Sequence, residues 1–187
     1  MTTTIITGGI GTGKSMVSHI LRVMGYPVYD CDAQAIRLIH DDCQLRQDIV
    51  ALMGEKAYDE QGRYDRQWVG ERVFLDRTLL LQLNALVHPA VARDIERWLE
   101  TQRTTRAFVE TALLRQSGLI AIADEVWRVD AHEQLRIQRV MRRSALTEQQ
   151  VRDRIAAQQA REMPYPDEHI IVNDERQPLL PQILKLI

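Results

Sequence analysis

Residues 7–15 read Thr-Gly-Gly-Ile-Gly-Thr-Gly-Lys-Ser. They fit the pattern G-x-x-x-x-G-K-[ST], in which Gly8 and Gly13 are the fixed glycines. The β-prone run 3–7 leads into the pattern, and apolar residues at helical spacing follow it. A strand–loop–helix unit of this kind binds nucleoside triphosphates, because loop N–H groups and the positive end of the helix surround the phosphate oxygens. The alternative is a glycine-rich turn that binds nothing, which this spacing and setting disfavour.

The residue types in the loop suggest separate roles. Lys14 is expected to reach the β and γ phosphates of ATP, and the hydroxyl of Ser15 is expected to hold Mg²⁺. The remaining nucleotide-binding positions in this stretch are expected to be Gly9, Ile10, Gly11, Thr12, Gly13 and Met16. The motif does not identify the molecule that receives the phosphate.

Composition limits the class of protein. The chain has 187 residues, of which 45% are hydrophobic and 27% charged, as expected of one soluble domain with insertions. A net charge of −2 argues against a nucleic-acid partner, and no stretch is apolar for long enough to cross a bilayer. The chain starts directly with the first strand, which indicates no signal peptide. Two cysteines make no disulfide framework, so we expect a cytoplasmic protein.

Two aspartates follow the second predicted strand, residues 27–29. Asp30 and Asp32 should lie beside the phosphate loop, because open α/β sheets bind ligands at the carboxyl ends of their strands. Either could act as a general base for an attacking hydroxyl or bind metal-bound water. The alternative for Asp32 is helix capping, since it precedes an apolar-periodic run.

The block from residue 33 to residue 106 is mostly helical in pattern. It is expected to contain a polar loop at 54–65 and helices at 66–74 and 77–87. His88-Pro89 predicts a break before a further helix that ends near residue 102, because the residue before proline disfavours the α conformation. The block is too long for a simple crossover, so it predicts a substrate-holding insert. His88 would contact an anionic ligand or cap the break.

Three further strands are expected at 107–110, 125–130 and 170–172, with a helix at 178–186 after the last. The third strand ends in Glu110, a weak candidate for ordering magnesium-bound water. A helix with four arginines follows the fourth strand: Arg136, Arg139, Arg142 and Arg143. Positions 136, 139 and 143 fall on one face of this helix. A capping box, Thr147-x-x-Gln150, opens the next helix. This helical hairpin predicts a lid whose arginines clamp phosphate, and the alternative is a solvated helix face.

Several motifs occur together in one order along the chain. They are the phosphate loop, Asp30-Cys31-Asp32 with Ala35, Gly62–Arg66 with Val73-Phe74, Leu83–Pro89, then Arg139, Arg143, Gln158 and Asn173. Taken together, their order and spacing resemble the dephospho-coenzyme A kinase family over nearly the whole chain.

The resemblance implies a fold, a reaction and residue roles. The fold would be α/β: a three-layer P-loop NTPase fold with a five-stranded parallel sheet, a helical substrate-binding insert and a helical lid. Within one kinase domain, 1–32 and 105–187 would form the nucleotide-binding core, 33–104 the CoA-substrate region and 131–160 the lid. The activity would be transfer of the ATP γ-phosphate to the ribose 3′-hydroxyl of dephospho-CoA, by a monomer or weak homo-oligomer.

By the same resemblance, Asp32 would be the base and would contact the substrate together with His88. Lys14 and Arg139 would be catalytic, Arg143 would help to clamp phosphate, and Asn173 would lie near the adenine.

The chain departs from the family pattern at a few places: Met16, Ile36, Ala112, Arg115 and Gln116. These departures bear more on substrate contacts than on ATP binding. Two alternatives therefore stay open. One is another small-molecule kinase on the same fold, such as a nucleoside or shikimate-type kinase. The other is a nucleotide-binding regulatory module without catalysis.

Overall fold

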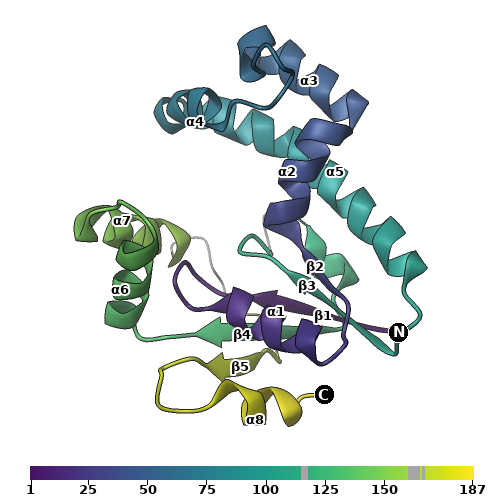
Figure 1. The fold of residues 1–187 in the computed structure, drawn as a ribbon, viewed down its shortest axis with the longest axis vertical. Coiled ribbons are helices and arrows are strands. Elements are labelled where there is room, and N and C mark those ends of the chain that lie inside the picture. Colours follow the sequence, from purple (N-terminus) through teal and green to yellow (C-terminus); the bar gives the residue numbers. More distant parts are fainter. Residues whose placement is uncertain (115–117, 160–164, 166) are drawn as a thin grey trace. The chain divides into compact units, whose positions relative to one another are not determined.

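The computed structural model describes residues 1–114, 118–159, 165 and 167–187 (Figure 1). Their contacts divide the chain into two units. The sheet unit comprises Met1–Asp30 and Gln102–Ile187, and the helical unit comprises Cys31–Thr101. The sequence-based boundaries, after residues 32 and 104, lie slightly further along the chain. Gln116 and Arg115, two of the departures noted above, fall outside the described residues, as does the last residue of the expected lid.

A five-stranded parallel sheet forms the centre of the sheet unit, which confirms the predicted fold class. The strands are β1 (Thr2–Thr7), β2 (Val28–Asp30), β3 (Arg106–Glu110), β4 (Glu125–Asp130) and β5 (His169–Val172). Their order across the sheet is β2-β3-β1-β4-β5. Because β1 is central, the loop that follows it lies in the middle of the sheet's carboxyl edge, where α/β proteins bind ligands.

One face of the sheet carries the main hydrophobic core of this unit. Helices α1 (Lys14–Val23) and α8 (Leu179–Leu184) contribute buried residues to it together with four strands. The cluster consists of Ile6, Val17, Leu21, Phe108, Trp127, Val129, Ile171 and Ile183. The burial of these apolar side chains holds α1 against the central strands, and it therefore also holds the loop before α1.

A helical hairpin follows β4, as predicted. It consists of α6 (Glu133–Arg143) and α7 (Glu148–Gln159) (Figure 1). A short 3₁₀ turn, η2 (Leu119–Ile122), precedes β4. The capping box is present: the Thr147 N–H donates to Gln150 Oε1 at 2.9 Å, and the Gln150 N–H donates to Thr147 Oγ1 at 3.3 Å. Four residues of the hairpin are almost fully buried in a small core of their own: Ile137, Val140, Val151 and Ile155.

The helical unit is built around its longest helix. Its elements are α2 (Cys31–Asp41), α3 (Cys43–Met53), η1 (Glu55–Ala57), α4 (Arg66–Leu75) and α5 (Arg77–Thr101). Helix α5 packs against α2, α3 and α4. The segment expected to be a plain loop, 54–65, instead contains η1 and an antiparallel bridge between Tyr58 and Tyr64.

The predicted helix break at His88-Pro89 is wrong, because α5 runs through both residues. A proline inside a helix removes one N–H donor and disfavours the preceding α conformation. Buried side chains continue on both sides of it, however: Leu83, Val87, Ala90, Val91 and Ile95. Packing of this continuous apolar stripe outweighs the local cost at Pro89. No helix in the described part of the chain is both long enough and apolar enough to cross a membrane.

Candidate active site

The phosphate loop joins β1 to α1 at the centre of the sheet. Gly13 is the N-cap of α1, with a left-handed φ of 95°, and no side chain caps this helix. A Cβ on Gly13 would lie 2.1 Å from Nδ2 of Asn173, so a larger residue would also collide with the segment after β5. The uncapped helix end leaves N–H groups and a positive dipole for an anion.

The side chains of the loop are held within it. Lys14 Nζ donates to the carbonyl oxygens of Gly8 at 2.8 Å and Gly9 at 3.4 Å. Thr12 is buried, and its hydroxyl donates to the Gly9 carbonyl at 2.9 Å. The ammonium of Lys14 therefore rests over the loop in the structure, at the place where phosphate oxygens would replace the carbonyls.

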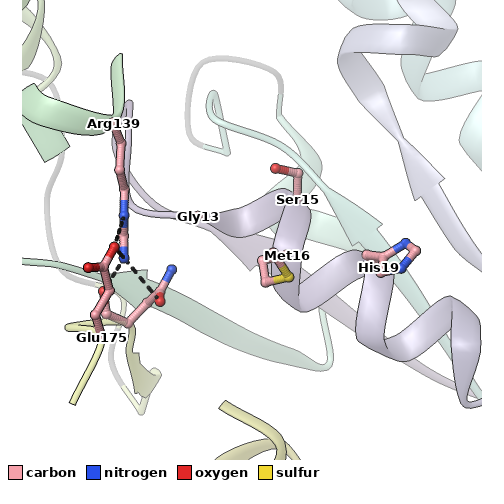
Figure 2. Close-up of a pocket in the computed structure, with 7 residues that line it drawn as sticks. Gly13, Ser15, Met16, His19, Arg139 and Glu175 are labelled. Atoms are coloured by element: carbon pink, nitrogen blue, oxygen red, sulfur yellow. Dashed lines mark hydrogen bonds and ion pairs between the residues drawn. The ribbon is translucent and has the colours of Figure 1, made fainter. Parts of the chain in front are cut away.

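A cleft of about 450 Å³ opens beside the start of α1. Figure 2 shows the residues that line it: Gly13, Ser15, Met16, His19, Arg139, Asn173 and Glu175. Five of these seven belong to the predicted site, and the cleft adds His19 and Glu175, which the sequence did not single out. Met16 is 54% exposed and supplies apolar surface at the cleft wall.

Arg139 reaches this cleft from α6. Its guanidinium donates to the carbonyls of Gly11 and Thr12, each at 3.4 Å. It also donates to the carbonyl of Asn173 at 3.1 Å and forms an ion pair with Glu175 at 3.1 Å (Figure 2). The structure therefore brings Arg139 and Asn173 together at the phosphate loop, where Asn173 Nδ2 also donates to the Thr12 carbonyl at 2.8 Å.

Two further residues that the sequence analysis named also contact the loop. Arg136 is only 6% exposed and its Nε donates to the carbonyl of Ile10 at 3.0 Å. Gln158 Oε1 accepts from the Ile10 N–H at 2.7 Å. Arg143, in contrast, is exposed in the last turn of α6. Sequence spacing had placed Arg136 on the same helix face as Arg139, among the arginines expected in the lid.

Two carboxylates end neighbouring strands near the loop. Asp30 and Glu110 are register partners in β2 and β3, and Glu110 is also paired with Ile6 of β1. Within the described part of the chain, the buried Oε2 of Glu110 has no hydrogen-bond partner. Burial raises the pKa of Glu110, and Asp30 raises it further, against the opposing effects of Ser18, Lys14 and Arg22. A buried carboxyl that responds to these charges is a candidate for function.

The remaining predicted residues lie in the helical unit. Asp32 is exposed in the first turn of α2, two residues after Asp30. Because α2 begins at Cys31, Asp32 lies inside the helix rather than at the capping position before it. His88 is half-buried in the middle of α5, and Ile36 is half-buried in α2.

Few side chains near the phosphate loop are candidate metal ligands in the part of the chain that the structure describes. The described residues contain no group of three or more His, Cys, Asp or Glu side chains that could hold an ion alone. Ser15 is exposed at the start of α1, where it lines the cleft. This donor set fits Mg²⁺, which keeps waters and takes phosphate oxygens as ligands.

Comparison with known proteins agrees with this geometry. The model of the dephospho-CoA kinase family matches residues 3–178. The chain belongs to the dephospho-CoA kinase family. A dephospho-CoA kinase of Porphyromonas gingivalis is 36% identical over 190 residues, which covers 100% of this chain and 93% of the relative. Family membership makes the chain an enzyme of the kinase class.

Two solved structures agree with this placement. A crystal structure from Thermus thermophilus has a TM-score of 0.81 at 31% identity and covers 99% of this chain and 95% of its own. A dephospho-CoA kinase from Campylobacter jejuni has a TM-score of 0.69 at 21% identity and covers 98% and 94%. The second likeness concerns the fold alone. Both alignments cover at least 98% of this chain.

Proposed function

We propose that the chain transfers the γ-phosphate of ATP to the ribose 3′-hydroxyl of dephospho-CoA, giving CoA and ADP in the last step of coenzyme A biosynthesis. One observation carries the proposal. A complete phosphate loop, with Lys14 over it and Arg139 beside it, occurs in a chain that the family matches over residues 3–178. Family membership supports the acceptor, and the loop supports the donor.

On the ATP side, the protein's task is positioning and charge neutralisation. Lys14 exchanges the carbonyls of Gly8 and Gly9 for β- and γ-phosphate oxygens. Arg139 exchanges loop carbonyls and Glu175 for phosphate in the same way, and Arg143 joins it on closure. The N–H groups of the loop, 9–13, surround the phosphates, while Met16 and Asn173 contact the nucleoside.

Mg²⁺ is the metal we propose for this reaction. The hydroxyl of Ser15 would hold it, and Asp30 and Glu110 would bind its waters, since both carboxylates end strands at the loop's edge of the sheet. When bound, Mg²⁺ neutralises charge that develops on the transferring phosphate. Burial raises the pKa of Glu110, and a bound cation beside it would favour the ionised form.

The helical unit is the proposed binding region for dephospho-CoA. Asp32 orients the ribose hydroxyl and accepts its proton, which requires an exposed and ionised carboxylate. Its place directly after the strand that ends in Asp30 supports this role. His88 contacts an anionic part of the substrate. A long acceptor offers binding energy away from the reacting hydroxyl, which the enzyme can use to orient it.

We further propose a cytoplasmic enzyme that acts as a monomer or weak homo-oligomer, without nucleic-acid or membrane partners. Its substrates are small molecules, as the family implies. The chain has two cysteines, Cys31 and Cys43, too few for a disulfide framework, which suits a reducing compartment.

The acceptor identifies the enzyme within its class. Purified protein with Mg²⁺-ATP is offered dephospho-CoA, adenosine, AMP and shikimate in parallel, and ADP release is followed. Dephospho-CoA is expected to be phosphorylated with the highest kcat/KM by at least about 100-fold, because truncated acceptors lose the remote binding energy that supports turnover. Adenosine should therefore show a lower kcat as well as a higher KM. Equal or faster turnover of adenosine or shikimate would contradict the proposal.

A further inference from the structure

Ile10, at the tip of the phosphate loop, contacts the helical hairpin with its side chain. The hairpin's core consists of Ile137 and Val140 from α6 with Val151 and Ile155 from α7, all at most 2% exposed. Ile10 packs against this core although it belongs to the loop after β1. The apolar contact therefore joins two parts of the site that are far apart in sequence. Ile10 and Arg136, for example, are separated by 126 positions.

The main chain of Ile10 is bound to the same hairpin. Its carbonyl accepts from Nε of Arg136 on α6 at 3.0 Å, and its N–H donates to Oε1 of Gln158 on α7 at 2.7 Å. Both polar groups of one loop residue are thus paired with side chains from both helices. Hydrogen bonds of this kind fix direction as well as distance, which a hydrophobic contact alone does not.

Helix α6 also packs directly on the residue after Ile10. A Cβ on Gly11 would lie 2.6 Å from the carbonyl oxygen of Arg136 and 3.0 Å from Cγ2 of Val140. The first atom belongs to the helix backbone, so a larger residue at Gly11 would have to push the whole helix away. The loop and the hairpin are therefore in main-chain contact at this point.

Arg139 lies three residues after Arg136 on the same helix, and it reaches the cleft from there. Its position above the loop follows from the position of α6. We propose that Ile10 is a positioning residue that couples the phosphate loop to the hairpin, so that the binding of phosphates and the placement of Arg139 occur together. The measurement of kcat described below rests on the proposed function. The measurement of hydrogen exchange with an ATP analogue does not require the proposed acceptor.

Ile10→Ala removes the apolar contact and leaves both main-chain hydrogen bonds available. The kcat with dephospho-CoA is expected to fall about tenfold or more, because a misplacement of about 1 Å at a reacting group can cost about 100-fold. The KM for dephospho-CoA should change by less than about twofold, since the acceptor is not bound by the loop. Ile10→Val, which keeps most of the contact, should restore kcat to within about twofold of the wild type.

Ile155→Ala is the matched control. It deletes the same atoms from the same hydrophobic core, but from α7 rather than from the loop. It should lower the melting temperature at least as much as Ile10→Ala while reducing kcat by less than about threefold. If Ile155→Ala reduces kcat as strongly as Ile10→Ala, or if Ile10→Val does not restore it, Ile10 is only part of the hairpin's core and the inference is wrong.

Hydrogen exchange tests the coupling without turnover. A non-hydrolysable ATP analogue with Mg²⁺ should slow amide exchange in α6 of the wild type, and this protection should be lost in Ile10→Ala at saturating analogue. Protection that is equal in both proteins would overturn the inference. Because this readout needs no acceptor, it separates a failure of the coupling from a failure of the proposed reaction.

Discussion

The ion pair between Arg139 and Glu175 should limit how tightly the protein binds ATP. Arg139 is committed to Glu175 Oε1 in the structure, through Nε at 3.3 Å and a terminal nitrogen at 3.1 Å. The substitution Glu175→Gln keeps the size of the side chain and removes its charge. Arg139 then reaches the phosphates without first losing an ionic partner, so the variant should bind ATP more tightly.

Exposure sets the size of this effect. The Arg139 side chain is 20% exposed and that of Glu175 is 60% exposed, so the pair is closer to a surface ion pair than to a buried one. Such pairs contribute about 0.2–1 kcal/mol, which corresponds to about 1.4- to 5-fold in the dissociation constant. The effect should shrink at high salt, because exposed charges are then screened.

Isothermal titration of Mg²⁺-ATP into both proteins, at low and high ionic strength, measures this difference. Asp174→Asn is the control, because it removes one negative charge from the same loop and keeps an oxygen for the N–H groups of Arg176 and Gln177. It should change ATP affinity less than Glu175→Gln does. Unchanged or weaker ATP binding by Glu175→Gln, or an equal gain from Asp174→Asn, would refute the reasoning.

Three further substitutions test individual residues. Lys14→Ala should lower kcat by about 100-fold or more, because one preorganised charge at the transferring phosphate is lost, while circular dichroism and melting temperature stay near those of the wild type. Asp32→Asn should lower kcat by about 10²- to 10⁴-fold with little change in the dissociation constant for ATP, since the amide cannot accept a proton; a normal kcat would remove Asp32 from the mechanism. Glu110→Gln tests pH dependence. Burial raises the pKa of Glu110, so the folded state binds this proton more tightly than the unfolded state, and the stabilisation is present at low pH and lost as pH rises through the raised pKa. The melting temperature of Glu110→Gln relative to the wild type should therefore increase as the pH rises from the ordinary pKa of a glutamate, about 4.3, through the raised pKa, and a difference independent of pH would contradict this assignment.

Local patterns predicted most of the sheet unit. The strands alternate with turn signals, and the loop motif occurs where β1 ends, so residues close in sequence were sufficient. The same local reasoning was wrong at Pro89, because the buried stripe from Leu83 to Ile95 depends on packing with α2, α3 and α4. The conformational preference of the residue before a proline is a local property, whereas the burial of this stripe depends on packing between several helices.

The site could be predicted only where a motif contained the residue. Lys14 and Ser15 come from the loop motif, Arg139 from the charge run on α6, and Asn173 from the family resemblance. Helical spacing put Arg136 and Arg143 on one face with Arg139 but could not tell which end of that face meets the loop. Arg136 meets it and is buried, whereas Arg143 is exposed at the far end of the helix. The pairing of Glu110 with Asp30 depends on strand register, which requires the whole sheet.

The identity of the product tests the central claim most directly. The wild-type protein and Lys14→Ala are incubated with Mg²⁺-ATP and dephospho-CoA, and the product is analysed by mass spectrometry and by phosphorus–proton correlation NMR. The account predicts one added phosphoryl group, on the ribose 3′-oxygen, in the wild-type reaction and a rate lower by about 100-fold or more in the variant. Phosphate on any other oxygen, or no transfer by the wild type, would contradict it.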